Sequence, residues 1–111
     1  MIRYAGVDSG SWNTKAVVID DAGRVLGTSV VRSGADLAAA AESSYDEALS
    51  KAGCVRTDIS AVWSTGFGRN AVPFADGSRT ELDCHGRGAA HYVQGPLVVI
   101  DIGGQDAKVI R

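Results

Sequence analysis

The sequence predicts an α/β domain with a mixed five-stranded sheet, in the order β-β-β-α-β-α-β. Segments rich in β-branched residues near the start of the chain are separated by short glycine turns. A segment with apolar residues at every third or fourth position follows them. A continuously apolar run, Leu97–Ile102, is typical of a strand that is buried on both faces. Together these observations favour a sheet with helices packed against it.

The first three strands are expected at Tyr4–Asp8, Thr14–Asp20 and Arg24–Val31. The second and third are joined by the turn Asp21-Ala22-Gly23, and the first two by another short glycine turn. Because such short turns reverse the chain, we expect the three strands to form an antiparallel meander.

A helix is expected over Asp36–Ala52. Gly53 stands where a C-terminal cap is expected, and Lys51 lies in the last turn, where a cation is favourable. The apolar stripe that would face the sheet consists of Leu37, Ala41, Tyr45, Ala48, Leu49 and Ala52.

The second half of the chain is expected to continue the alternation. A fourth strand is predicted at Ile59–Ser64, followed by a turn at 65–68. A second helix is predicted to begin at Thr80 and to end at Gly95-Pro96. After Leu97–Ile102, a glycine turn leads into a further strand at Asp106–Ile110.

Composition excludes several classes of protein. The chain has 111 residues and a formal net charge of −2, which argues against a basic nucleic-acid binder. The longest apolar run, Leu97 to Ile100, is far shorter than the roughly 20 residues that cross a bilayer. The start of the chain does not read as a secretory signal, and two cysteines make no disulfide scaffold. We therefore expect a cytoplasmic protein with reduced thiols.

The turn after the first strand has the composition of a phosphate-binding loop. Asp8 stands at the strand end, where a carboxylate can hold hydrated Mg²⁺. Gly10 lets the backbone approach a phosphate, and Lys15 adds a positive charge. Hydroxyl donors are supplied by Ser9, Ser11 and Thr14. The alternative is a plain hairpin turn, since the same residue types are good turn formers.

A second turn of the same kind follows the apolar run near the C-terminus. It again has an acid at a strand end, Asp101, followed by Gly103 and Gly104. Gln105 could orient an attacking water, and Asp101 could accept its proton or bind the metal through water. This turn could also be a plain hairpin. Two such turns facing each other would hold a polyphosphate from both sides, which makes the pair more specific than either turn alone.

With both turns present, the chain resembles the superfamily of actin, sugar kinases and heat-shock chaperone ATPases. More narrowly it is similar to the BadF/BadG/BcrA/BcrD family, the ATPase activators of 2-hydroxyacyl-CoA dehydratases and ATPase subunits of benzoyl-CoA reductases. The first turn is evidence for the superfamily only, whereas the later segments are specific to this family. The segments that carry the resemblance are Gly6–Ser11 with Thr14-Lys15, Ser64–Asn70, Thr80–Ala89 and Val99–Ile110.

The resemblance implies a ribonuclease H-like, actin-like ATPase fold and a set of residue roles. Asp8 would bind Mg²⁺ through water and act in catalysis together with Asp101 and Gln105. ATP phosphates would be held by Ser9, Gly10, Ser11, Thr14, Lys15, Gly103 and Gly104. Thr65, Gly66 and Arg69 would line the cleft. The resemblance also implies a homo- or heterodimer with one [4Fe–4S] cluster, and transfer of a low-potential electron to a dehydratase or reductase that acts on acyl-CoA.

The family also sets expectations about domain organisation. Its members are longer than this chain, and their cluster cysteines and adenosine motif lie beyond the second turn. We therefore expect residues 1–95 to form domain I and residues 96–111 to be the first hairpin of a domain II. The 111 residues alone would then be an inactive N-terminal part of the protein. Trp12-Asn13 stands where relatives carry small hydroxyl residues.

Two other functions remain open from the sequence. One is a kinase of the same superfamily that phosphorylates a small metabolite, and the other is a non-catalytic interaction domain. The remaining reactive side chains favour structural readings. Cys84 and His85 are adjacent and have no second ligand pair at zinc-like spacing, and Cys54 is expected to be a small buried side chain.

Overall fold

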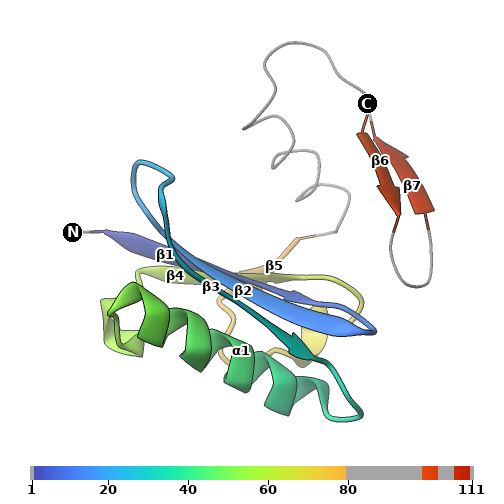
Figure 1. The fold of residues 1–111 in the computed structure, drawn as a ribbon, viewed down its shortest axis with the longest axis horizontal. Coiled ribbons are helices and arrows are strands. Elements are labelled where there is room, and N and C mark those ends of the chain that lie inside the picture. Colours follow the sequence, from blue (N-terminus) through green and yellow to red (C-terminus); the bar gives the residue numbers. More distant parts are fainter. Residues whose placement is uncertain (1, 80–98, 103–106, 111) are drawn as a thin grey trace.

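A five-stranded mixed sheet with one long helix across it forms the N-terminal part of the molecule (Figure 1). The computed structural model describes residues 2–79, 99–102 and 107–110. The order of strands in the sheet is β3-β2-β1-β4-β5. Their bounds are β1 Arg3–Ser9, β2 Asn13–Asp20, β3 Val25–Arg32, β4 Ala61–Thr65 and β5 Gly77–Ser78.

The first three strands form the predicted antiparallel meander. β1 pairs with β2 along its whole length, and β2 pairs with β3. A bulge at Val18/Ile19 shifts the register of the second pair. The turn between β2 and β3 has Gly23 at φ 82°, a conformation that glycine adopts without steric cost.

The helix α1 spans Leu37–Ala52 and connects β3 to β4, which is parallel to β1. It begins where the Asp36 carboxylate accepts a hydrogen bond from the Ala39 N–H at 3.0 Å, and it ends at Gly53. The predicted helix and both of its ends are therefore confirmed. Two short 3-10 helices follow at Arg56–Asp58 and Arg69–Ala71.

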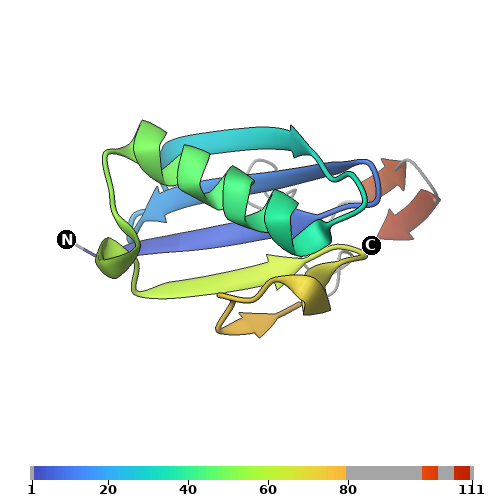
Figure 2. The same cartoon turned by 90° about the horizontal axis from the view of Figure 1, so that it is seen from below.

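α1 covers one face of the sheet, as the view turned by 90° shows (Figure 2). Tyr45 is at the centre of this contact, and its ring stacks on that of Phe74 with 4.5 Å between the ring centroids. Burial raises the pKa of the Tyr45 hydroxyl. The buried apolar residues of the sheet and helix that meet here are Ala5, Val7, Ala16, Val18, Ala41, Tyr45, Ala48, Leu49 and Val62.

The five-stranded sheet is confirmed, but the identity of its fifth strand corrects the prediction. That strand is β5, which pairs in parallel with β4. With two residues, it is too short to show any periodic pattern in the sequence. The predicted strand at 97–102 is present as β6, Val99–Ile102, and forms a separate antiparallel pair with β7, Ala107–Ile110. The helix predicted from Thr80 lies outside the described residues.

Among the described residues, no helix is both long and apolar enough to span a membrane.

Candidate functional site

The site is built where the carboxyl ends of β1 and β4 meet. The two strands are parallel neighbours, and their register places Asp8 beside Thr65. On the other side of β1, Asp8 is the cross-strand partner of Lys15 on β2. Ligands of α/β proteins bind outside the carboxyl ends of parallel strands, where successive loops leave the sheet. The pairing of β1 with β4 therefore gives Asp8 the position of a ligand-binding residue.

Asp8 lies directly against the turn that follows β4. A Cβ atom at Gly66 would lie 2.5 Å from Asp8 Oδ1 and 2.6 Å from the Ser9 carbonyl oxygen. Gly66 also has φ 94°, which side chains rarely adopt. Only glycine therefore allows the Asp8 carboxylate to stay in this place.

Hydrogen bonds hold the turn after β4 against β1. The Gly68 N–H donates to the Ser9 carbonyl oxygen at 2.8 Å, and the Arg69 guanidinium donates to the Gly66 carbonyl oxygen at 3.1 Å. The Ser64 hydroxyl donates to the Arg69 carbonyl oxygen at 2.8 Å. These hydrogen bonds fix the position of the turn relative to Asp8.

The turn between β1 and β2 is a tight hairpin with Ser11 and Trp12 at its tip. The Gly10 N–H donates to the Asn13 carbonyl oxygen at 3.0 Å. A Cβ atom at Gly10 would lie 2.7 Å from that same oxygen, so the turn requires glycine here. No hydrogen bond within the described part of the chain uses the N–H of Ser11 or Trp12. Two neighbouring backbone donors at a loop tip are suited to an anion.

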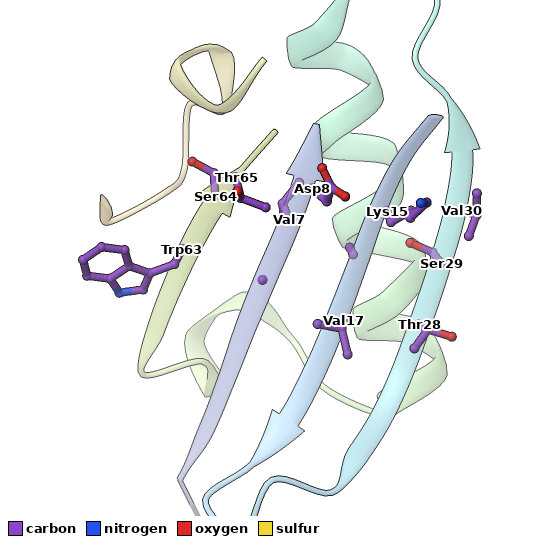
Figure 3. Close-up of a pocket in the computed structure, with 12 residues that line it drawn as sticks. Val7, Asp8, Lys15, Val17, Thr28, Ser29, Val30, Trp63, Ser64 and Thr65 are labelled. Atoms are coloured by element: carbon purple, nitrogen blue, oxygen red, sulfur yellow. The ribbon is translucent and has the colours of Figure 1, made fainter. Parts of the chain in front are cut away.

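A pocket of about 460 Å³ lies on the face of the sheet opposite α1 (Figure 3). Asp8, Lys15 and Thr65 supply polar side chains near its end at the carboxyl edge of β1 and β4. Its walls are otherwise mainly apolar, and the described residues that form them include Val17, Val30 and Trp63. Asp8 and Lys15, the carboxylate and the positive charge of the predicted site, thus line the same pocket.

The side chains of two other predicted residues lie on the opposite face, beneath α1. Thr14 is fully buried, and its hydroxyl is 2.8 Å from that of Ser33. Ser9 is fully buried, and its hydroxyl has no hydrogen-bond partner among the described residues. Strand alternation explains this separation, since successive side chains point to opposite faces. Asp8 and Lys15 are therefore brought together, whereas the Ser9 and Thr14 side chains are not part of that group.

Ser33 is a residue of the site region that the sequence analysis missed. Its hydroxyl donates to the Gly10 carbonyl oxygen at 2.5 Å, and its N–H donates to the Trp12 carbonyl oxygen at 2.9 Å. Ser33 thus holds both ends of the hairpin tip in place. No sequence signal could have found it, because a serine after a strand is an ordinary loop residue.

Of the second predicted turn, the structure describes the flanking strands. Asp101 is in β6 and is the cross-strand partner of Lys108 in β7. Gly103, Gly104 and Gln105 lie outside the described residues. The antiparallel pairing of the strands on either side of this turn is confirmed.

A third strand-end acid, Asp20, is used by its own turn. Its carboxylate accepts hydrogen bonds from the N–H of Ala22, the N–H of Arg24 and the Arg24 guanidinium, each at 2.9 Å. The backbone hydrogen bond from Arg24 is the main reason why the pKa of Asp20 lies below its ordinary value. The carboxylate oxygens of Asp20 therefore accept their hydrogen bonds within its own hairpin.

The described residues contain no cluster of three or more metal-ligating side chains. The donor set beside the pocket is one carboxylate, Asp8, with the buried Thr65 hydroxyl next to it. Mg²⁺ commonly binds through one or two carboxylates and keeps several waters. This donor set therefore fits a hydrated magnesium ion and does not fit a metal held entirely by protein ligands.

The sheet order, the crossover helix and a ligand edge at β1 and β4 define the class of protein. The fold is that of actin-like ATPases, an α/β fold of the ribonuclease H-like type. A ROK hexokinase from Thermus thermophilus shares the fold, with a TM-score of 0.64 over 98% of this chain at 17% identity.

The chain belongs to the BadF/BadG/BcrA/BcrD ATPase family, whose model matches residues 5–111. It is 37% identical to an activator of lactoyl-CoA dehydratase from Anaerotignum propionicum over 96% of this chain and 40% of that protein. The structure of (R)-2-hydroxyglutaryl-CoA dehydratase component A from Acidaminococcus fermentans superposes with a TM-score of 0.90 at 35% identity, covering 98% of this chain and 42% of that one.

A second similar structure is the activator of 2-hydroxyisocaproyl-CoA dehydratase from Clostridium difficile with bound ADPNP. It has a TM-score of 0.89 at 33% identity and is matched over 97% of this chain and 40% of its own length. The resemblance predicted from the sequence is confirmed at the level of family and fold. The chain spans about two fifths of the length of these relatives.

Proposed function

We propose that this chain is the N-terminal nucleotide-binding part of an ATP-hydrolysing activator of a 2-hydroxyacyl-CoA dehydratase or benzoyl-CoA reductase. The observation that carries the proposal is the meeting of Asp8 with the Thr65-Gly66 turn at the carboxyl ends of β1 and β4. Family membership and the ADPNP bound to one relative support ATP as the ligand.

Each described residue of the site has a physical role in this proposal. Asp8 binds the waters of a magnesium ion, and Gly66 leaves room for its carboxylate. The N–H groups of Ser11 and Trp12 and the side chain of Lys15 bind phosphate oxygens. Ser9, Gly10 and Thr14 hold the hairpin in shape, with Ser33 beneath it. When bound, the magnesium ion neutralises charge that develops on the phosphates.

The second turn completes the proposed site from the other side. Gly103 and Gly104 would allow close approach to phosphate, and Asp101 and Gln105 would position the attacking water. The division into a domain I at 1–95 and the start of a domain II at 96–111 belongs to this proposal. So do the dimer, the [4Fe–4S] cluster and the dehydratase or reductase that accepts the electron. Cys54 is buried and is not proposed as a cluster ligand.

Hydrolysis of Mg-ATP by the complete gene product, meaning the full reading frame that contains these residues, tests the proposal. Asp8→Asn should slow hydrolysis by about 100-fold or more, because it removes a charge that acts in the transition state. Asp21→Asn makes the same change at an exposed turn residue and should leave the rate unchanged. Equal rates for wild type and Asp8→Asn would contradict the proposed function.

A metabolite kinase is the main alternative within the superfamily. The likeness to a ROK hexokinase is one of fold alone, at 17% identity, and no described residue favours a sugar as substrate. Phosphate release from Mg-ATP without any added acceptor supports the activator. Turnover that depends on an added sugar or other alcohol supports the kinase.

A further inference from the structure

Thr65 is a buried residue whose hydroxyl has no hydrogen-bond partner among the described residues. The residue is 9% exposed. A buried polar group without a partner costs free energy, so it calls for an explanation. Neither the sheet nor the turn after β4 supplies one, because the turn is held by Ser64, Gly68 and Arg69 instead.

The position of Thr65 places its side chain on the pocket face of the sheet. Along β4, Val62 and Ser64 are buried towards α1, and alternation puts Trp63 and Thr65 on the opposite face. Thr65 lines the pocket together with Asp8, as the close-up shows at the ends of β1 and β4 (Figure 3). The Ser9 hydroxyl also has no hydrogen-bond partner among the described residues. However, the Ser9 hydroxyl lies close to the place that a Cβ atom at Gly68 would take, and Ser9 is not among the described residues that line the pocket.

The pairing of Asp8 with Thr65 allows the two side chains to share a water molecule. They are register partners on adjacent parallel strands, which lie ~4.8 Å apart in a sheet. A water between a carboxylate and a hydroxyl on neighbouring strands can donate one hydrogen bond to each of them. A hydrated magnesium ion offers such waters, since it keeps most of its hydration shell.

We propose that the Thr65 hydroxyl is a second anchor for the hydrated divalent cation of the nucleotide, accepting a hydrogen bond from a metal-bound water shared with Asp8. This inference rests on the proposed function, because it assigns Thr65 to the same Mg-ATP site. Thr65 is a positioning residue in this scheme, since it acts on the cation through water.

Thr65→Val in the complete gene product tests the inference by two opposite effects. Valine removes the unpartnered hydroxyl, so the melting temperature of the ligand-free protein should stay the same or rise. The Mg²⁺ concentration for half-maximal ATP hydrolysis should rise about 10-fold or more, as for loss of an outer-sphere partner. The rate at saturating Mg²⁺ should change far less than it does in Asp8→Asn.

Matched variants separate the possible outcomes. Thr65→Ser retains the hydroxyl and should restore the Mg²⁺ dependence of the wild type. Thr57→Val makes the same change at an exposed residue of the 3-10 helix Arg56–Asp58, which does not line the pocket, and should alter nothing. Thr65→Ala repeats the test with a smaller side chain if the valine variant does not fold.

The inference and the proposed function fail in different ways. A lower melting temperature with unchanged Mg²⁺ dependence in Thr65→Val would mean a structural role and would overturn the inference alone. The same conclusion follows if Asp8→Asn abolishes hydrolysis while both Thr65→Val and Thr65→Ala behave as wild type. If Asp8→Asn is fully active, the proposed function is wrong and the inference is overturned with it.

Discussion

Asp8 and Asp20 are two aspartates with similar sequence surroundings and different structural environments. Each lies at the end of a strand and precedes a short turn that contains glycine. The Asp20 carboxylate accepts three hydrogen bonds from Ala22 and Arg24 in its own turn. The Asp8 carboxylate lies instead against Gly66, on a turn that follows a different strand.

This difference shows which structural feature allows an acid at a strand end to become part of a binding site. The Asp20 turn lies at the opposite end of the meander, between two antiparallel strands. Asp8 is on the strand that also has a parallel neighbour, β4, so a second loop reaches it at the same edge of the sheet. An acid before a glycine turn is therefore only a candidate, and the neighbouring parallel strand supplies the rest of the site.

The largest effect is expected from Gly66→Ala in the turn next to Asp8. The new Cβ would meet both Asp8 Oδ1 and the Ser9 carbonyl oxygen, and φ 94° is unfavourable for alanine. Hydrolysis of Mg-ATP by the complete gene product should fall by about 100-fold, as for loss of a group that acts in the transition state. Stability should fall by about 1–3 kcal/mol through backbone strain, measured by urea unfolding.

Gly23→Ala is the matched change beside Asp20. Gly23 has φ 82°, so alanine should also cost about 1 kcal/mol or more of stability there. Hydrolysis per folded molecule should be unchanged, because this turn is remote from Asp8. A loss of activity in Gly23→Ala as large as that in Gly66→Ala would remove the distinction between the two turns.

Asp20→Asn should lower the melting temperature by a few degrees and leave hydrolysis unchanged. Asparagine can keep one acceptor oxygen, but it loses the charge that attracts the Arg24 guanidinium. Thermal unfolding and the hydrolysis rate, measured on the same preparation, check both parts. A loss of hydrolysis in Asp20→Asn as large as that in Asp8→Asn would mean that Asp20 also belongs to the site.

The same aspartate makes stability depend on pH. The hydrogen bonds to Asp20 lower its pKa in the folded state, the Arg24 backbone bond most of all. Its stabilising contribution is therefore fully present above the unfolded pKa of about 3.9 and is lost as the pH falls through the folded pKa. The difference in unfolding free energy between wild type and Asp20→Asn should accordingly shrink as the pH falls below 4. A difference that stays constant from pH 6 to pH 2 would contradict this assignment.

The smallest effect is expected from Ser33→Ala beneath the hairpin tip. The change removes the hydrogen bonds of the Ser33 hydroxyl to Thr14 and to the Gly10 carbonyl oxygen. Stability should fall by about 1 kcal/mol, and KM for ATP should rise modestly while kcat stays the same. Ser60→Ala, at an exposed serine before β4, is a suitable control and should change neither quantity.

Much of the fold could be predicted from local patterns. Alternating β-branched residues located the first four strands within a few residues, and Asp36 and Gly53 marked the ends of α1. The two-residue strand β5 could not be predicted, because its place in the sheet depends only on pairing with β4. The apolar strand at 97–102 was counted as the fifth strand of the order β-β-β-α-β-α-β, whereas it pairs with β7, as the hairpin expected at 96–111 requires.

The candidate site could be predicted in part. Asp8, Gly10 and Lys15 were found because acid, glycine and lysine in a strand-end turn have a chemical meaning by themselves. Ser33 and the pairing of Thr65 with Asp8 could not be found, since both depend on contacts between residues distant in sequence. Ser9 and Thr14 were grouped with Asp8 by proximity along the chain, whereas strand alternation puts their side chains on the other face.

The sequence by itself determined the class of fold, the family and the turn that carries Asp8, because these follow from local propensity and from residue order. Only the tertiary structure decided which strand-end aspartate faces a pocket and which one serves its own turn. The physical reason is the crossover through α1, which brings β4 beside β1 in parallel register. That pairing places Gly66 against the Asp8 carboxylate and makes the buried Thr65 the register partner of Asp8.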